Sequence, residues 1–129
     1  MTGTALIVDD NKLNLETLAV LLDKEGFSAI TLTTPRDIFA TLDEVGKVDV
    51  VFLDLEYPND DGLVAINDLR EHPALENVPI IAYSVHISEI HETRAAGFDG
   101  FIGKPLDVTT FPQHLERILQ GIPVWEVGQ

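Results

Sequence analysis

Short apolar runs alternate with longer amphipathic segments along this chain. Five runs rich in β-branched and aliphatic residues predict strands, at Ala5–Val8, Phe27–Leu32, Val48–Leu53, Val78–Ala82 and Gly100–Ile102. In the segments between and after them, apolar residues recur every three or four positions, the spacing of one helix face. The alternation predicts an α/β fold, with a parallel sheet of five strands flanked by helices.

Several helix ends are marked by residues that favour caps. Gly26 can end the first helix in a left-handed conformation. Thr34 followed by Pro35 is typical of an N-cap and the first helical position. The helix expected over residues 87–96 offers few apolar side chains, so we expect the sheet to hold it weakly.

Length and composition are those of one small domain. The chain has 129 residues, 45% of them apolar, which is enough to build one core. We expect one domain over residues 1–121 and a frayed, non-helical tail over residues 122–129, in which Trp125 is an alternative anchor for a partner or a second copy. No apolar run is long enough to span a membrane, no secretory signal opens the chain and cysteine is absent. These features predict a cytoplasmic protein with no membrane contact.

The charge balance is strongly acidic. Eight Lys and Arg against 22 Asp and Glu give a net charge of −14. Such a surface repels a phosphate backbone, so we expect no direct binding to nucleic acid. Cations and basic partner surfaces stay open as ligands.

Polar residues follow the predicted strands where a parallel sheet binds ligands, at the carboxyl ends. Asp9 and Asp10 follow the first strand, Asp54 follows the third, Ser84 the fourth and Lys104 the fifth. Three carboxylates this close repel one another unless a cation neutralises them. Oxygen ligands without histidine or cysteine favour a hard ion, and an open site favours Mg²⁺ that keeps several waters.

The same set of side chains is suited to phosphoryl transfer onto a carboxylate. Asp54 would supply the attacking oxygen, Lys104 would hold charge on the phosphoryl oxygens and Ser84 would donate a hydrogen bond to the transferred group. Any one Asp at a strand end is more often a helix cap or turn former. The case for chemistry therefore depends on all of them meeting at one edge.

Four separated motifs together resemble the receiver domain of two-component response regulators. They are Asp9-Asp10-Asn11, the segment Leu53–Gly62, Ser84 and Gly103-Lys104-Pro105. The spacing between the motifs is kept over about residues 5–120. The resemblance implies a doubly wound, flavodoxin-like (βα)5 fold with strand order 2-1-3-4-5.

The resemblance also implies a mechanism. The aspartate at Asp54 accepts a phosphoryl group from the phosphohistidine of a sensor histidine kinase, using Mg²⁺. The metal ligands would be Asp10, Asp54 and the backbone carbonyl of Glu56, with Asp9 acting through water. Lys104 would pair with the phosphoryl group.

A conformational switch is implied as well. In receivers, the hydroxyl of Ser84's position moves toward the phosphoryl group, and an aromatic residue, here Phe101, turns inward. The alternative is that Phe101 is an ordinary core residue. The bond between Lys104 and Pro105 would be cis.

Two positions near the motifs depart from the commonest receiver pattern. Tyr57 stands where methionine is usual, and we expect this to change only local packing. Val85 stands where small residues are usual, and its bulk can restrict water or a phosphatase from reaching the acyl phosphate.

We therefore expect a stand-alone receiver, which would signal by contact with a downstream effector or by phosphorelay to a histidine phosphotransfer protein. It would phosphorylate and dephosphorylate itself without being an enzyme on separate substrates. Kinases of the family dock near Asn11, Leu13 and Asn14, and a homodimer would use the tail or the face formed by residues 87–96, strand 100–102 and the last helix. Two alternatives stay open: an interaction module that works unphosphorylated, and a phosphatase of the haloacid dehalogenase type, although Glu56 replaces the second aspartate of that type.

Overall fold

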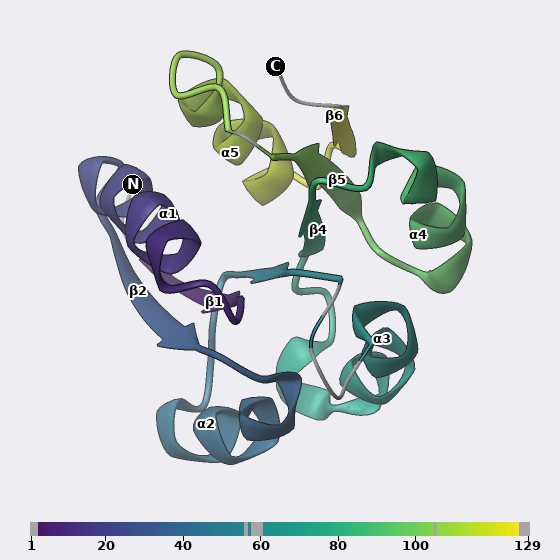
Figure 1. Ribbon diagram of the computed structural model, residues 1–129. Coiled ribbons are helices and arrows are strands. Elements are labelled where there is room, and N and C mark those ends of the chain that lie inside the picture. The colour runs from purple at the N-terminus through teal and green to yellow at the C-terminus, as the bar shows by residue number, and fades with distance from the viewer. Residues whose placement is uncertain (1–2, 56, 58–60, 105, 127–129) are drawn as a thin grey trace.

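A parallel sheet forms the centre of the molecule. The computed structural model describes residues 3–55, 57, 61–104 and 106–126. Within these residues, six parallel strands pair in the order β2-β1-β3-β4-β5-β6 (Figure 1). They are β1 (Gly3–Val8), β2 (Phe27–Leu32), β3 (Val50–Leu53), β4 (Ile80–Ser84), β5 (Gly100–Gly103) and β6 (Val124–Glu126). The predicted α/β fold and the order 2-1-3-4-5 are confirmed, with one strand added beyond β5.

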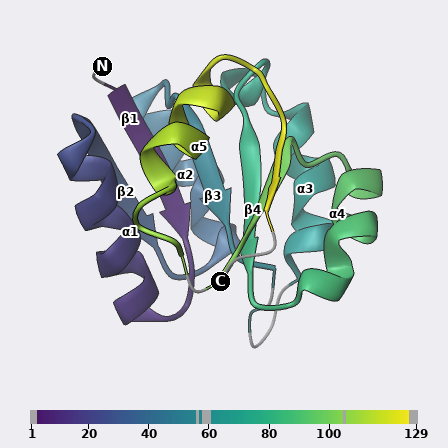
Figure 2. The same ribbon diagram turned by 90° about the horizontal axis from the view of Figure 1, so that it is seen from above.

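Helices cover both faces of the sheet. They are α1 (Lys12–Lys24), α2 (Ile38–Val45), α3 (Gly62–Glu71), α4 (Ile90–Ala96) and α5 (Phe111–Leu119). One buried cluster joins the sheet to α1 and α5, and a second joins its other face to α2 and α3. In Figure 2, α5 lies in front of the sheet and α2 behind it. The sheet is therefore apolar on both faces, which leaves its strand ends for polar side chains.

Two of these helices, α1 and α3, begin at residues whose side chains cap them. The side chain of Asn11 accepts a hydrogen bond from the amide of Asn14 (3.1 Å), and that of Asp61 accepts one from Leu63 (2.8 Å). Thr34 is confirmed as an N-cap, accepting from the Arg36 amide at 3.3 Å, but the helix opens with a 3₁₀ turn over Pro35–Asp37. Gly26 follows α1 with φ of 87°, as its predicted left-handed cap requires.

α4 has a small buried surface. It spans seven residues, of which Thr93 is fully buried, and the Thr93 hydroxyl donates to the carbonyl of Glu89 at 2.7 Å. A 3₁₀ turn over Ile87–Glu89 precedes it. The short helix agrees with the low apolar content of this segment. Among the described residues, no helix is long and apolar enough to cross a membrane.

The prediction of five strands and a frayed tail is wrong for the residues of β6. Val124 pairs with Gly100 and Trp125 with Phe101 in parallel register. Gly100 permits this contact, because a Cβ there would lie 2.6 Å from the carbonyl oxygen of Val124. The Trp125 ring packs against the core and lies 4.3 Å from the guanidinium carbon of Arg94 on α4. The tail therefore covers the edge of β5.

Substituting Gly100 with alanine tests this strand. We expect Gly100→Ala to push β6 off β5 and to lower the free energy of unfolding by about 1–3 kcal/mol, the usual cost of overpacking. Trp125 is the sole tryptophan of the chain, so its fluorescence should shift to the red as the ring becomes wetter.

The matched control is the same substitution in a chain truncated after Gly121. Removing Val124 removes the clash, so Gly100→Ala should cost much less in the shortened chain. An equal cost in both chains would mean that the glycine is needed for another reason.

Candidate functional site

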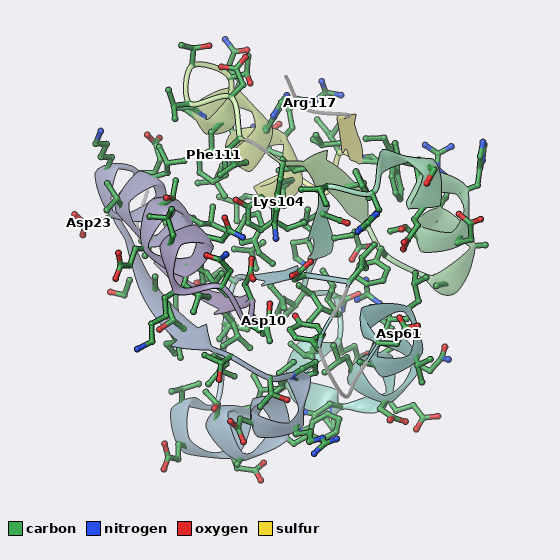
Figure 3. The ribbon with its side chains drawn as sticks, viewed as in Figure 1. Asp10, Asp23, Asp61, Lys104, Phe111 and Arg117 are labelled. Carbon is green, nitrogen blue, oxygen red and sulfur yellow. The ribbon has the colours of Figure 1, made fainter. Side chains whose placement is uncertain are left out.

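Four strand ends bring the predicted polar residues to one edge of the sheet. Val8 pairs with Leu53, so the residues that follow them, Asp9 and Asp54, are neighbours. Carboxylate oxygens of Asp9, Asp10 and Asp54 all lie within 4.8 Å of one another. Figure 3 labels Asp10 and Lys104, which lie near the centre of that view. The predicted convergence of three carboxylates and an ammonium group is confirmed as geometry.

The Lys104 ammonium bridges two of the carboxylates. Its nitrogen lies 2.9 Å from Oδ2 of Asp9 and 3.4 Å from Oδ2 of Asp54. The side chain is only 10% exposed and its Nζ lies 4.6 Å from the centre of the Tyr83 ring. Asp9 is fully buried and its other oxygen accepts from the amide of Asn11 at 2.9 Å. A buried carboxylate requires such partners, and Lys104 supplies the countercharge.

Asp54 is the carboxylate whose ionisation is most disturbed. Burial raises the pKa of Asp54 from 3.8 to about 6, even though Lys104 acts to lower it, and the Asp9 charge raises it further. One oxygen accepts from the amide of Leu55 at 2.8 Å, which orients the carboxylate. Without a further cation, the charged form of Asp54 is therefore costly at this edge.

The cluster has the chemistry of a magnesium site. Its donors are hard carboxylate oxygens from Asp9, Asp10 and Asp54, and Asp10 is exposed, so waters can complete the coordination. The three side chains line an open depression of about 430 Å³. Glu56, whose backbone carbonyl is the fourth predicted ligand, lies outside the described residues, and so does Pro105 with its predicted cis bond.

Neither predicted switch residue is among the described residues that line this depression. Ser84 ends β4, is 1% exposed and accepts a hydrogen bond on Oγ from the amide of His86 at 3.0 Å. Phe101 is fully buried within the core and pairs with Trp125 across the strands. In this structure Phe101 is a core residue. The movement of Ser84 or Phe101 on phosphorylation stays a prediction.

Tyr57 takes part in the site in a way that sequence reasoning missed. We expected it to alter only local packing. Its side chain lines the depression, and its hydroxyl donates to the backbone carbonyl of Val8 at 2.8 Å. The sequence signal was limited to the unusual residue type, because the acceptor is a backbone atom 49 positions earlier.

The family is decided by a comparison with known proteins. A family model described as the response regulator receiver domain matches residues 5–116. The chain belongs to this receiver family. Receivers act in two-component phosphorelay signalling together with histidine kinases, and they bind Mg²⁺ through an acidic pocket, which the Asp9, Asp10 and Asp54 cluster matches.

Relatives of this receiver include small regulators and parts of large kinases. It is 26% identical to the polar-differentiation response regulator DivK of Brucella ovis, covering 92% of this chain and 98% of that protein. It is 28% identical to the probable histidine kinase 6 of Oryza sativa subsp. japonica over 90% of this chain, but spans only 14% of that protein.

A solved structure has the same fold. The CheY-like receiver domain from Methylobacillus flagellatus matches with a TM-score of 0.81 and 29% identity, covering 92% of this chain and 99% of that one.

The raised pKa of Asp54 makes a prediction about stability in metal-free buffer. Since the folded pKa of about 6 exceeds the ordinary 3.8, the folded state binds the proton more tightly, and the wild type loses stability as pH rises through this window. We expect Asp54→Asn to be more stable than wild type by about 3 kcal/mol at pH 8 and to lose most of this advantage near pH 4.

Urea unfolding across this pH range measures the difference. Saturating Mg²⁺ is the control, because a cation compensates the ionised carboxylate and should shrink the gap at pH 8. If the variant were no more stable than wild type at pH 8, Lys104 alone would compensate for the burial of Asp54.

Proposed function

We propose that this receiver accepts a phosphoryl group on Asp54 from the phosphohistidine of a sensor histidine kinase, in the cytoplasm and with Mg²⁺. The observation that supports this most is the Lys104 ammonium, which lies between Asp9 and Asp54 at the edge of an open, three-carboxylate depression. An ion pair that only stabilised the fold would not require a third carboxylate, and the third carboxylate here, Asp10, is exposed to solvent.

The proposed step is an in-line transfer. A carboxylate oxygen of Asp54 forms a bond to phosphorus while the bond between phosphorus and the imidazole nitrogen breaks, and the imidazole leaves with the electron pair. Lys104 lies within reach of Asp54 and pairs with charge on the phosphoryl oxygens. Bound Mg²⁺ would neutralise further charge on the phosphoryl oxygens, and Asp10 and Asp54 would hold it, with Asp9 acting through water.

The proposed output is a change of surface near α4 and β5. Ser84 ends β4, and its backbone carbonyl accepts from the Lys104 amide at 2.9 Å, so the hydroxyl and the ammonium belong to linked strand ends. The phosphorylated state would favour Ser84 turned toward the phosphoryl group and Phe101 held inward. Its partners would be an effector protein, a histidine phosphotransfer protein or a second copy of the chain.

Intact-mass analysis with Mg²⁺ and a small phosphodonor tests the acceptor. We expect one phosphoryl adduct on wild type and none on Asp54→Asn, because asparagine has no anionic oxygen to attack phosphorus. Asp61→Asn is the matched control, since it removes a carboxylate that caps α3 and lies outside the cluster. It should be phosphorylated as wild type is.

Other results would favour the rival functions. Adducts on Asp54→Asn would exclude Asp54 as the acceptor. Steady hydrolysis of a generic phosphate ester would favour a phosphatase. Partner binding that is the same in wild type and Asp54→Asn, with and without phosphodonor, would favour a module that works unphosphorylated.

Val85 is expected to lengthen the life of the acyl phosphate. Its side chain is 59% exposed and lines the depression that holds Asp54, so it can obstruct water approaching the phosphorus atom. We expect Val85→Ala to shorten the half-life of the phosphorylated form about two- to tenfold, a change of up to about 1.4 kcal/mol in the barrier.

Loss of the adduct after removal of the phosphodonor measures this half-life. Val108→Ala is the control, because Val108 is similarly exposed at 57% but does not line the depression. An unchanged or longer half-life in Val85→Ala would contradict the shielding role.

A further inference from the structure

One backbone oxygen beside the acidic cluster accepts two hydrogen bonds. The carbonyl of Val8, the residue directly before Asp9, accepts from the amide of Asp54 at 2.9 Å and from the hydroxyl of Tyr57 at 2.8 Å. The first of these bonds continues the ladder between β1 and β3. The second comes from a side chain and extends the attachment to β1 beyond the end of β3.

These two bonds hold both ends of the segment that follows the proposed acceptor. Asp54 is attached through its amide and Tyr57 through its hydroxyl, and both bonds end on the same oxygen. Between them, the Leu55 amide donates to the Asp54 carboxylate and the Leu55 carbonyl accepts from the amide of Gly62 at 2.8 Å. The described backbone hydrogen bonds of Asp54 and Leu55 therefore attach this segment to β1, to the Asp54 carboxylate and to the start of α3.

The hydroxyl is suited to a lasting donor role. Tyr57 is half-buried, and its hydroxyl oxygen lies 2.8 Å from the Val8 carbonyl oxygen. A phenol has one proton to donate and a backbone carbonyl can only accept, so the direction of this hydrogen bond is fixed.

We propose that Tyr57 is a positioning residue, whose hydroxyl fixes the backbone after Asp54 and so preorganises the cation and phosphoryl site. This rests on the proposed function of Asp54. Tyr57 and the backbone of Asp54 share the Val8 oxygen as acceptor, so loss of the hydroxyl should loosen the backbone that carries the Asp54 ligand. A residue that served packing alone would need the ring but not the hydroxyl.

Tyr57→Phe separates the two roles, because it keeps the ring and removes one oxygen. We expect this variant to bind Mg²⁺ about three- to tenfold more weakly in calorimetric titration of the unphosphorylated chain. Its Asp54 amide should exchange with solvent faster than in wild type, since the end of the β1–β3 ladder is less firmly held.

Thr93→Val is the matched control. It also removes a buried hydroxyl that donates to a backbone carbonyl, but on α4, away from the cluster. It should lower the unfolding temperature without changing the affinity for Mg²⁺. An equal loss of affinity in both variants would reduce the Tyr57 effect to general destabilisation and overturn the proposal.

Other outcomes separate this proposal from the phosphorylation proposal. If Tyr57→Phe binds Mg²⁺ as wild type does and its Asp54 amide is unchanged, the positioning role is wrong even if wild type is phosphorylated. If Tyr57→Phe binds Mg²⁺ weakly while wild type gives no adduct, phosphorylation of Asp54 is wrong but the role of Tyr57 in the cation site stands.

If Tyr57→Phe does not fold, a measurement on the wild type tests the proposal instead. In wild type, NMR should find the Tyr57 hydroxyl proton exchanging slowly and close to the Asp54 amide proton. A hydroxyl that exchanges as fast as an exposed tyrosine would overturn the proposal.

Discussion

The ion pair of Lys104 with Asp9 and Asp54 is the interaction on which the site depends. Asp9 is fully buried, and an ionised carboxylate in that position is tolerated only with a close countercharge. Lys104 is closer to Asp9, at 2.9 Å, than to Asp54, at 3.4 Å, and therefore compensates Asp54 incompletely. Burial therefore raises the pKa of Asp54, because the attraction of Lys104 lowers it by less than burial raises it. A site with more negative than positive charge is ready to gain from a cation, which is the condition for metal binding at an open edge.

The fold creates this site through the register of its strands. Parallel pairing places the carboxyl ends of β1, β3, β4 and β5 at one edge, and the strands themselves bury apolar side chains on both faces. Polar residues are excluded from the strand centres and are concentrated where the strands end. The proposed phosphoryl chemistry on Asp54 would take its side chains from the ends of neighbouring strands of one sheet.

The sequence predicted the parts of this structure that follow from periodicity and strand ends. Asp9, Asp10, Asp54 and Lys104 meet as expected because each follows an apolar run whose pairing is set by the parallel fold. β6 was missed because its three residues carry no periodic signal, and its pairing depends on space left by Gly100, far along the chain. The Tyr57 hydroxyl bond was missed for a similar reason, since its acceptor is a backbone atom of another strand. Local patterns identify strand ends but not the contacts that distant backbone atoms accept.

β5 connects the charged edge of the sheet to β6 and, through β6, to α4. Lys104 follows β5 directly, and within β5 Phe101 is buried beside Trp125 of β6, whose ring contacts Arg94 of α4. A phosphoryl group on Asp54, as proposed, would attract the Lys104 ammonium away from Asp9. Because Lys104 follows β5 directly, this pull would reach a strand that also contacts β6 and α4. A shift in that strand changes the surface only if the two arrangements bind the phosphoryl group with different free energies. α4 is short and Thr93 is its one fully buried residue, so the proposed phosphorylation of Asp54 would rearrange this helix at small cost.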